Sequence, residues 1–80
     1  MKHTTRDLTQ AAAVADVRAR LQDGRAKTVR EASGLSQSEV ARAIGVHASA
    51  LSRWEAGSRA PRGDAALRLG RLLDRLEARP

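Results

Sequence analysis

The side chains that could carry chemistry in this chain are few and scattered, which argues against an enzyme. Ser36 has no histidine and carboxylate arranged around it, as a nucleophilic serine needs. His47 has no second ligand at a spacing suited to a metal ion. Asp74 and Glu77 fall on a predicted exposed helix, and the glycines are dispersed instead of forming a phosphate-binding loop. We therefore expect no catalytic residue, metal, cofactor or small-molecule ligand.

The charge of the chain points instead to an anionic partner. Fifteen Lys and Arg against nine Asp and Glu give a formal net charge of +6, which favours nucleic acid, an acidic membrane surface or an acidic protein. Almost all of the cations are arginine, whose guanidinium can pair bidentately with phosphate and with the edge of guanine. A GC-rich genome would also enrich arginine and alanine, so charge alone does not choose the partner.

Length and composition predict a single small domain. Eighty residues leave no room for a second, ligand-sensing domain. The chain has no cysteine, which fits a reducing compartment. No apolar run approaches the roughly 20 residues that span a bilayer, and the first residues do not resemble a signal peptide. The expected location is the cytoplasm, with no membrane partner.

Good helix formers dominate the chain, and clusters of β-branched and aromatic residues are missing. The pattern predicts an all-α, compact bundle of about five helices. Residues 1–8 are expected to be disordered, and a first helix should run from Thr9, its N-cap, to Asp23. A second helix is predicted over residues 25–33, although Gly24 could also lie inside one long helix. The inward residues of these segments are Val14, Val17, Leu21, Ala26 and Val29.

Two short helices joined by one glycine-containing turn are predicted next. Ser36 and Glu39 form a capping box that starts a helix ending at Gly45. The next helix should cover residues 48–55 and close at Gly57. This spacing is typical of a helix-turn-helix, in which Ala41 must be small and Gly45 must adopt a positive φ. The second helix keeps an outward face of small or hydrogen-bonding side chains, suited to approaching base edges: His47, Ala48, Ser49, Ser52, Arg53 and Ala56.

A last helix is predicted over residues 64–78, with Asp64 at its positive end. Its inward stripe comprises Ala66, Leu69, Leu73 and Leu76. Leu67 lies off this stripe. Leu72 and Leu76 are i, i+4 neighbours at its edge. They could cover the N-terminal helix or form a dimer interface.

Residues 29–73 resemble the Cro/CI-type helix-turn-helix domain, also called Xre-like or lambda-repressor-like. The matching residues are Val29-Arg30-Glu31-Ala32-Ser33-Gly34-Leu35-Ser36-Gln37, Val40-Ala41, Ile44-Gly45-Val46, Leu51-Ser52-Arg53-Trp54-Glu55, Gly57, Arg59 and Pro61. The resemblance divides the chain into an N-terminal tail and extra helix, residues 1–24, and a helix-turn-helix domain, residues 25–80. It implies a DNA-binding regulator of transcription, such as a phage Cro-like or bacterial Xre-like repressor.

The resemblance also implies roles for single residues. Ala48, Ser49, Ser52 and Arg53 match the base-reading positions. Gln37, His47 and Arg59 match positions near DNA phosphates. The family often has asparagine at the position of Ala56, where it can contact a phosphate, and Arg59 or Arg62 could compensate for its loss. Arg30 and Glu55 match a structural ion pair. The structural positions of the motif are completed by Ala41, Gly45, Val46, Leu51, Trp54 and Gly57.

Several alternatives stay open at this point. Arg53 could read guanine or contact only phosphate, and the same choice applies to Ser49. Trp54 fits the core better than a base-stacking role. Residues 1–24 could lengthen the bundle, contact DNA as an arm or serve a homodimer on an operator. An antitoxin or interaction module with the same helix-turn-helix, and a nonspecific architectural protein, are the rival functions.

Overall fold

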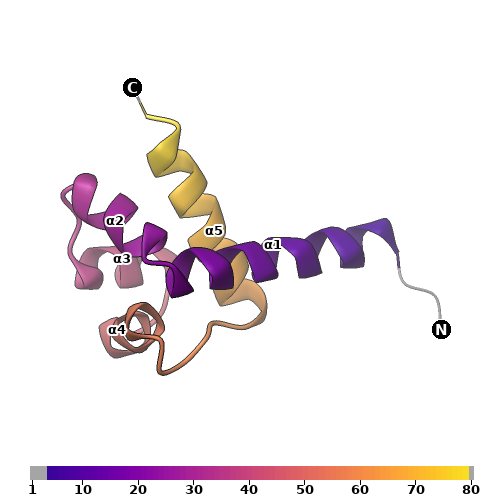
Figure 1. Cartoon of the computed structure of the whole chain (residues 1–80), viewed down its shortest axis with the longest axis horizontal. Helices are drawn as coiled ribbons and strands as arrows, with labels where there is room; N and C mark the ends of the chain where they lie inside the picture. Colours follow the sequence, from indigo (N-terminus) through magenta and orange to yellow (C-terminus); the bar gives the residue numbers. More distant parts are fainter. Residues whose placement is uncertain (1–3, 80) are drawn as a thin grey trace.

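Five helices make up the fold, which we describe for residues 4–79 of a computed structural model. In chain order they are α1 (Thr5–Gln22), α2 (Arg25–Ala32), α3 (Gln37–Ile44), α4 (Ala48–Ala56) and α5 (Gly63–Glu77). Figure 1 shows α2, α3 and α4 gathered at one end of the molecule, while α1 crosses α5 and extends away from them. No strand occurs among the described residues, and the predicted all-α bundle of about five helices is confirmed.

The first helix begins earlier than its apolar pattern predicts. Thr4 is the N-cap, because its Oγ1 accepts a hydrogen bond from the amide of Asp7 at 3.1 Å. The carboxylate of Asp7 accepts in return from the amide of Thr4 at 3.3 Å, which completes a capping box. Thr9 lies inside the helix and donates its hydroxyl to the carbonyl of Thr5. The predicted disorder is therefore wrong for residues 4–8, and residues 1–3 lie outside the described part.

The break at Gly24 separates α1 from α2, so the alternative of one long helix is wrong. Gly24 has a φ of +85°, in the left-handed region that a side chain disfavours. The other predicted boundaries hold to within a residue: α2 ends at Ala32, α4 extends to Ala56, and α5 begins at Gly63. Such shifts are smaller than the uncertainty of helix ends in general.

One hydrophobic core joins all five helices. Its buried side chains come from α1 (Val17, Leu21), α2 (Ala26), α3 (Val40, Ala41, Ile44), α4 (Leu51, Trp54) and α5 (Ala66, Leu69, Leu73). Trp54 is buried, which confirms the predicted core role for the only aromatic residue. Val29 and Val46 are half-buried and pack against this core, and Val14 is half-buried on α1. The buried face of α4 therefore holds its opposite face outward.

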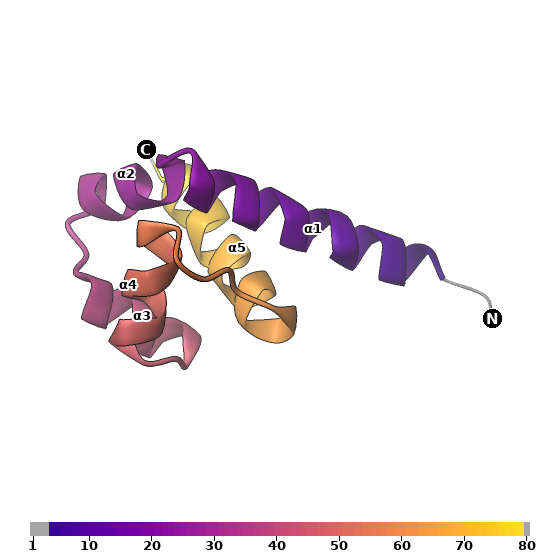
Figure 2. The same cartoon turned by 60° about the horizontal axis from the view of Figure 1, so that its bottom comes forward.

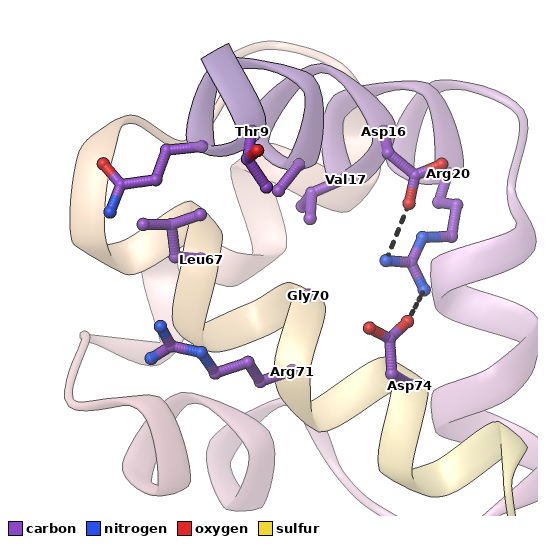
Figure 3. Close-up of a pocket in the computed structure, with 10 residues that line it drawn as sticks. Thr9, Asp16, Val17, Arg20, Leu67, Gly70, Arg71 and Asp74 are labelled. Atoms are coloured by element: carbon purple, nitrogen blue, oxygen red, sulfur yellow. Dashed lines mark hydrogen bonds and ion pairs between the residues drawn. The ribbon is translucent and has the colours of Figure 1, made fainter. Parts of the chain in front are cut away.

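The crossing of α1 and α5 is tight and charged (Figure 3). Gly70 lies at the crossing, where a β-carbon would come within 2.7 Å of Val17 Cγ2. The side chain of Arg20 is only 8% exposed and pairs with Asp16, Asp74 and Glu77 at 3.0, 3.1 and 3.2 Å. Because Asp74 and Glu77 belong to α5, the ion pairs connect the first helix to the last. The C-terminal half of α1 is thus fixed to the bundle.

The remaining leucines of α5 contribute to the bundle. Leu67 is half-buried and lines a groove with Thr9 and Val17 of α1. Leu72 packs against the core, and Leu76 lies beside Val29 of α2. Of the two alternatives for these leucines, their positions favour covering neighbouring helices.

Candidate nucleic-acid interface

The start of α3 is set by its own sequence. Ser36 Oγ accepts a hydrogen bond from the amide of Glu39 at 3.0 Å, and the Glu39 carboxylate accepts from the amide of Ser36 at 2.9 Å. The hydrogen bonds from Ser36 lower the pKa of Glu39, so this carboxylate stays ionised at neutral pH beside the positive end of the helix. The predicted capping box is confirmed.

The turn between α3 and α4 depends on Gly45, which has a φ of +77°. This conformation lets the amide of Val46 donate to the carbonyl of Ala41 at 2.9 Å and close the end of α3. Ala41 is only 1% exposed, as expected for a small residue between two close helices. Arg68 of α5 adds a bond that sequence analysis missed, because its Nε donates to the carbonyl of Ile44 at 2.7 Å.

The outward face of α4 is polar and exposed. Leu51 and Trp54 point into the core, while Ser49, Ser52 and Arg53 are exposed on the opposite side. His47 is the exposed N-cap residue. Ala48, the fourth residue matched to a base-reading position, is half-buried and packs against the core. Figure 2 shows α4 at the surface of the bundle in front of α3.

A buried ion pair holds α4 at a defined angle to α2 and α3. Glu55 accepts two hydrogen bonds from Arg30, from Nε at 2.7 Å and from Nη2 at 2.8 Å. Gln37 donates its amide to Glu55 at 2.9 Å, and Arg30 also donates to the carbonyl of Leu35. Burial alone would raise the pKa of Glu55, but the hydrogen bonds from Arg30 and Gln37 outweigh it, so the pKa is lowered. The carboxylate therefore remains charged.

The loop between α4 and α5 carries two exposed cations, Arg59 and Arg62. The amides of Ser58 and Arg59 donate to the carbonyl of Arg53 at 3.0 and 3.3 Å, which attaches the start of the loop to the end of α4. Pro61 is fully buried. Arg18 of α1 donates from Nε to the carbonyl of Pro61 at 3.0 Å. The extra helix thereby supports the loop that presents these arginines.

Sequence analysis missed Arg18 and Arg68 for the same reason. Each donates to a backbone carbonyl on a different element, 43 and 24 residues away along the chain. A carbonyl acceptor leaves no signature in side-chain type, so no local pattern could reveal either contact. Arg53, Arg59 and Arg62 are all exposed, and their contact with DNA stays a prediction.

No group of three or more His, Cys, Asp or Glu side chains within residues 4–79 is placed to hold a metal ion. No helix of the described residues is long and apolar enough to cross a membrane.

A helix with an exposed polar face, held against a second short helix by a glycine turn, defines a helix-turn-helix DNA-binding protein. Comparison with known families agrees: a family model described as helix-turn-helix matches residues 27–77, more than half of the chain. The chain belongs to the Cro/CI-type, Xre-like helix-turn-helix family, a family of DNA-binding regulators. The predicted resemblance is confirmed, and the match leaves out α1. No curated protein and no solved structure matches the chain.

Proposed function

We propose that this protein is a sequence-specific repressor that inserts α4 into the major groove of double-stranded DNA. The observation that carries the proposal is the exposed polar face of α4, which is held outward by the buried Leu51 and Trp54 and by the Arg30–Glu55 pair. A helix presented in this way fits the major groove, where each base pair offers a distinct pattern of donors and acceptors.

Base recognition is assigned to the outward residues of α4. Arg53 can donate two parallel hydrogen bonds to the O6 and N7 atoms of guanine. Ser49 and Ser52 are exposed hydroxyls that can bond to either a base or a phosphate. Ala48 offers only a methyl contact, and its half-buried position limits it to the edge of the interface.

Phosphate contacts are assigned to residues that flank this face. Arg59 and Arg62 are exposed on the loop after α4, and His47 is exposed at its N-terminus. Gln37 begins α3 and already supports α4 through Glu55, so its contribution to DNA binding is partly that of a positioning residue. Neutralising phosphates releases counterions and gives affinity, while α4 supplies discrimination. Repression follows if the bound protein occupies a promoter.

The proposal is tested by selecting bound sequences from random duplex DNA with the purified protein at near-physiological salt. We expect an enriched motif of a few base pairs, with guanine at the position nearest Arg53. Binding without enrichment, together with an affinity that falls steeply with salt on every sequence, would replace the proposal by nonspecific, architectural binding. Absence of DNA binding at low salt would refute it and leave the interaction-module alternative.

A further inference from the structure

The side of α1 that faces away from the bundle carries an unpartnered apolar face. It consists of Leu8, Ala11, Ala12, Ala15 and Ala19, which we call the outer face of α1; all five are exposed. At 3.6 residues per turn these positions fall within an arc of about 100°, centred opposite Val17. Leu8 is 64% exposed and is the one large hydrophobic side chain exposed among residues 4–79. Helix α1 is thus apolar on two opposite sides, and the bundle covers only one.

The outer face is presented by a rigidly anchored helix. Arg20 and the close contact at Gly70 fix the C-terminal half of α1 to α5. The N-terminal half continues beyond the bundle in both views (Figures 1 and 2), and its first turn is secured by the Thr4–Asp7 capping box. A solvated helix needs only one apolar side to pack on its own domain, so a second apolar side is typical of helices that bind another helix.

We propose that the outer face of α1 pairs with the same face of a second copy of this chain, in the antiparallel direction. Charge complementarity selects this occupant and this register. Asp7 and Arg18 lie on the same flank of the outer face, and they carry opposite charges. If residue n of one copy lies level with residue 25 − n of the other, each Asp7 meets an Arg18. Arg18 is half-buried and donates from Nε to Pro61, so this contact would be made by its Nη nitrogens.

The same register also matches the shapes of the two faces. Leu8 of each copy falls level with position 17 of the other, and therefore between Ala15 and Ala19 on the opposed face. The methyl side chains of alanine allow the helices to approach closely enough for the leucine to be buried. A parallel two-fold pair would place Leu8 against Leu8 and would put the Asp7–Arg18 flanks of the two copies on opposite sides of the pair, which leaves both Arg18 side chains without a carboxylate from the other copy.

The pairing has a consequence for DNA binding, and this part of the argument rests on the proposed function. In Figure 1, α1 crosses in front of α5, so its outer face is turned toward the viewer, and α4 lies below it. The two-fold axis of an antiparallel pair then runs vertically in this view. Both copies of α4 consequently lie on the same side of the pair, as binding to one face of a duplex requires.

The separation of the two copies also fits a duplex. The two copies of Gln22 would be 19 residue steps apart along the paired helices, which is about 28 Å at 1.5 Å per residue. Helix α4 lies at this end of α1, since Trp54 lines a common cavity with Leu21 and Gln22. Half-sites one helical turn apart are separated by about 34–36 Å. The pair therefore separates the ends of α1 that lie next to α4 by a distance comparable to one helical turn of DNA.

The contact is small, and each copy carries a net charge of +6. The outer face contributes five side chains from each copy, whereas a stable protein interface contains roughly 20–30 residues from each partner. We therefore expect weak pairing in solution that strengthens on DNA, where phosphates neutralise the repulsion and neighbouring half-sites raise the effective concentration.

Single-cysteine cross-linking tests the pairing directly, because the chain has no cysteine of its own. Near the centre of the proposed register, Ala12→Cys should form a disulfide-linked dimer on mild oxidation at high protein concentration. The matched control is Ala13→Cys, an exposed neighbour that lines the groove against α5; it should stay monomeric. Leu8→Cys should not cross-link to itself, because its copies would lie about 14 Å apart along the helices. Equal cross-linking at positions 12 and 13, or efficient cross-linking at position 8, would overturn the proposal.

A binding experiment separates this proposal from the proposed function. Leu8→Glu should lower the affinity for an inverted repeat of the selected motif by about tenfold or more, and leave the affinity for one half-site unchanged. Gln10→Glu introduces the same charge on the other side of α1 and should change neither affinity. Equal losses for Leu8→Glu and Gln10→Glu would refute pairing through the outer face. A lack of any selected motif would refute the proposed function, and cross-linking at position 12 would still decide the pairing.

Discussion

Replacing Glu55 by glutamine tests whether the buried ion pair holds α4 in place. The side chains of Arg30 and Glu55 are 10% and 5% exposed, so the pair is almost entirely removed from water. Glu55→Gln keeps the shape of the side chain but removes its charge and one of its two acceptors. Removing one partner of a buried pair costs about 3–5 kcal/mol, because the other charge is left buried. A glutamine that still accepts one bond from Arg30 should lower the free energy of unfolding by about 2–3 kcal/mol.

The measurement is urea denaturation, followed by helical circular dichroism and by the fluorescence of Trp54, the only tryptophan of the chain. A loss of this size corresponds to a fall in Tm of roughly 10–20 °C for a domain this small. The control is Glu31→Gln, which makes the same chemical change at an exposed position of α2 and should stay within about 0.5 kcal/mol. If Glu55→Gln also lowered the free energy of unfolding by less than about 0.5 kcal/mol, the ion pair would not stabilise the fold.

The same residue predicts how stability depends on pH. The folded pKa of Glu55 is lowered from its ordinary value of 4.5, so the unfolded chain binds the proton more readily than the folded protein. Its contribution to stability is therefore present above pH 4.5 and is lost as the pH falls through the lower folded pKa. The Glu55→Gln variant should show a shallower loss of stability over that acidic range. An identical slope in both proteins would contradict the assigned pKa direction.

Four further substitutions test the interface and the turns. Arg53→Ala should weaken binding to the selected motif by ~1–3 kcal/mol and barely change binding to random DNA; an equal loss on both would make it a phosphate contact. Arg59→Ala should weaken binding to all sequences and lower the slope of log K against log salt by about one, so an unchanged slope would remove it from the interface. Gly45→Val should lower the free energy of unfolding by about 1–3 kcal/mol; a side chain has room there, but the φ of +77° is strained for any residue except glycine. Unchanged thermal stability would refute this. Gly70→Ala should destabilise by ~1 kcal/mol despite the better helix propensity of alanine, since the new methyl would lie 2.7 Å from Val17 Cγ2. Combined with Val17→Ala it should cost less than the sum of the two single changes, and strict additivity would contradict the close contact.

Sequence alone was sufficient where the decisive interactions are local. The capping box of Ser36 and Glu39 is an i, i+3 pattern, and the turn at Gly45 needs a conformation that glycine favours. The outward face of α4 follows from the spacing of its apolar residues. The start of α1 was also local, yet it was missed: Thr4 and Asp7 form a capping box with aspartate in place of glutamate, close to a terminus where disorder is the usual expectation.

The interactions that sequence could not predict are those between distant elements. Arg20 appears on α1 as one more polar residue, and only the fold brings Asp74 and Glu77 of α5 to its guanidinium. Likewise, the need for glycine at position 70 arises from the crossing with Val17 and has no signature within α5. The roles of Ser49, Ser52 and Arg53 toward DNA remain predictions, since their exposure permits contact with bases and with phosphates alike.

In α4, the residues that stabilise the fold and the residues proposed to contact DNA lie on opposite sides of the helix. Ser49, Ser52 and Arg53 are exposed, whereas the residues that fix α4, such as Leu51 and Glu55, lie on its other side. Substitutions at exposed positions of this kind usually change stability by less than about 0.5 kcal/mol. Natural variation can therefore change the chemistry of the face proposed to contact DNA without weakening the bundle.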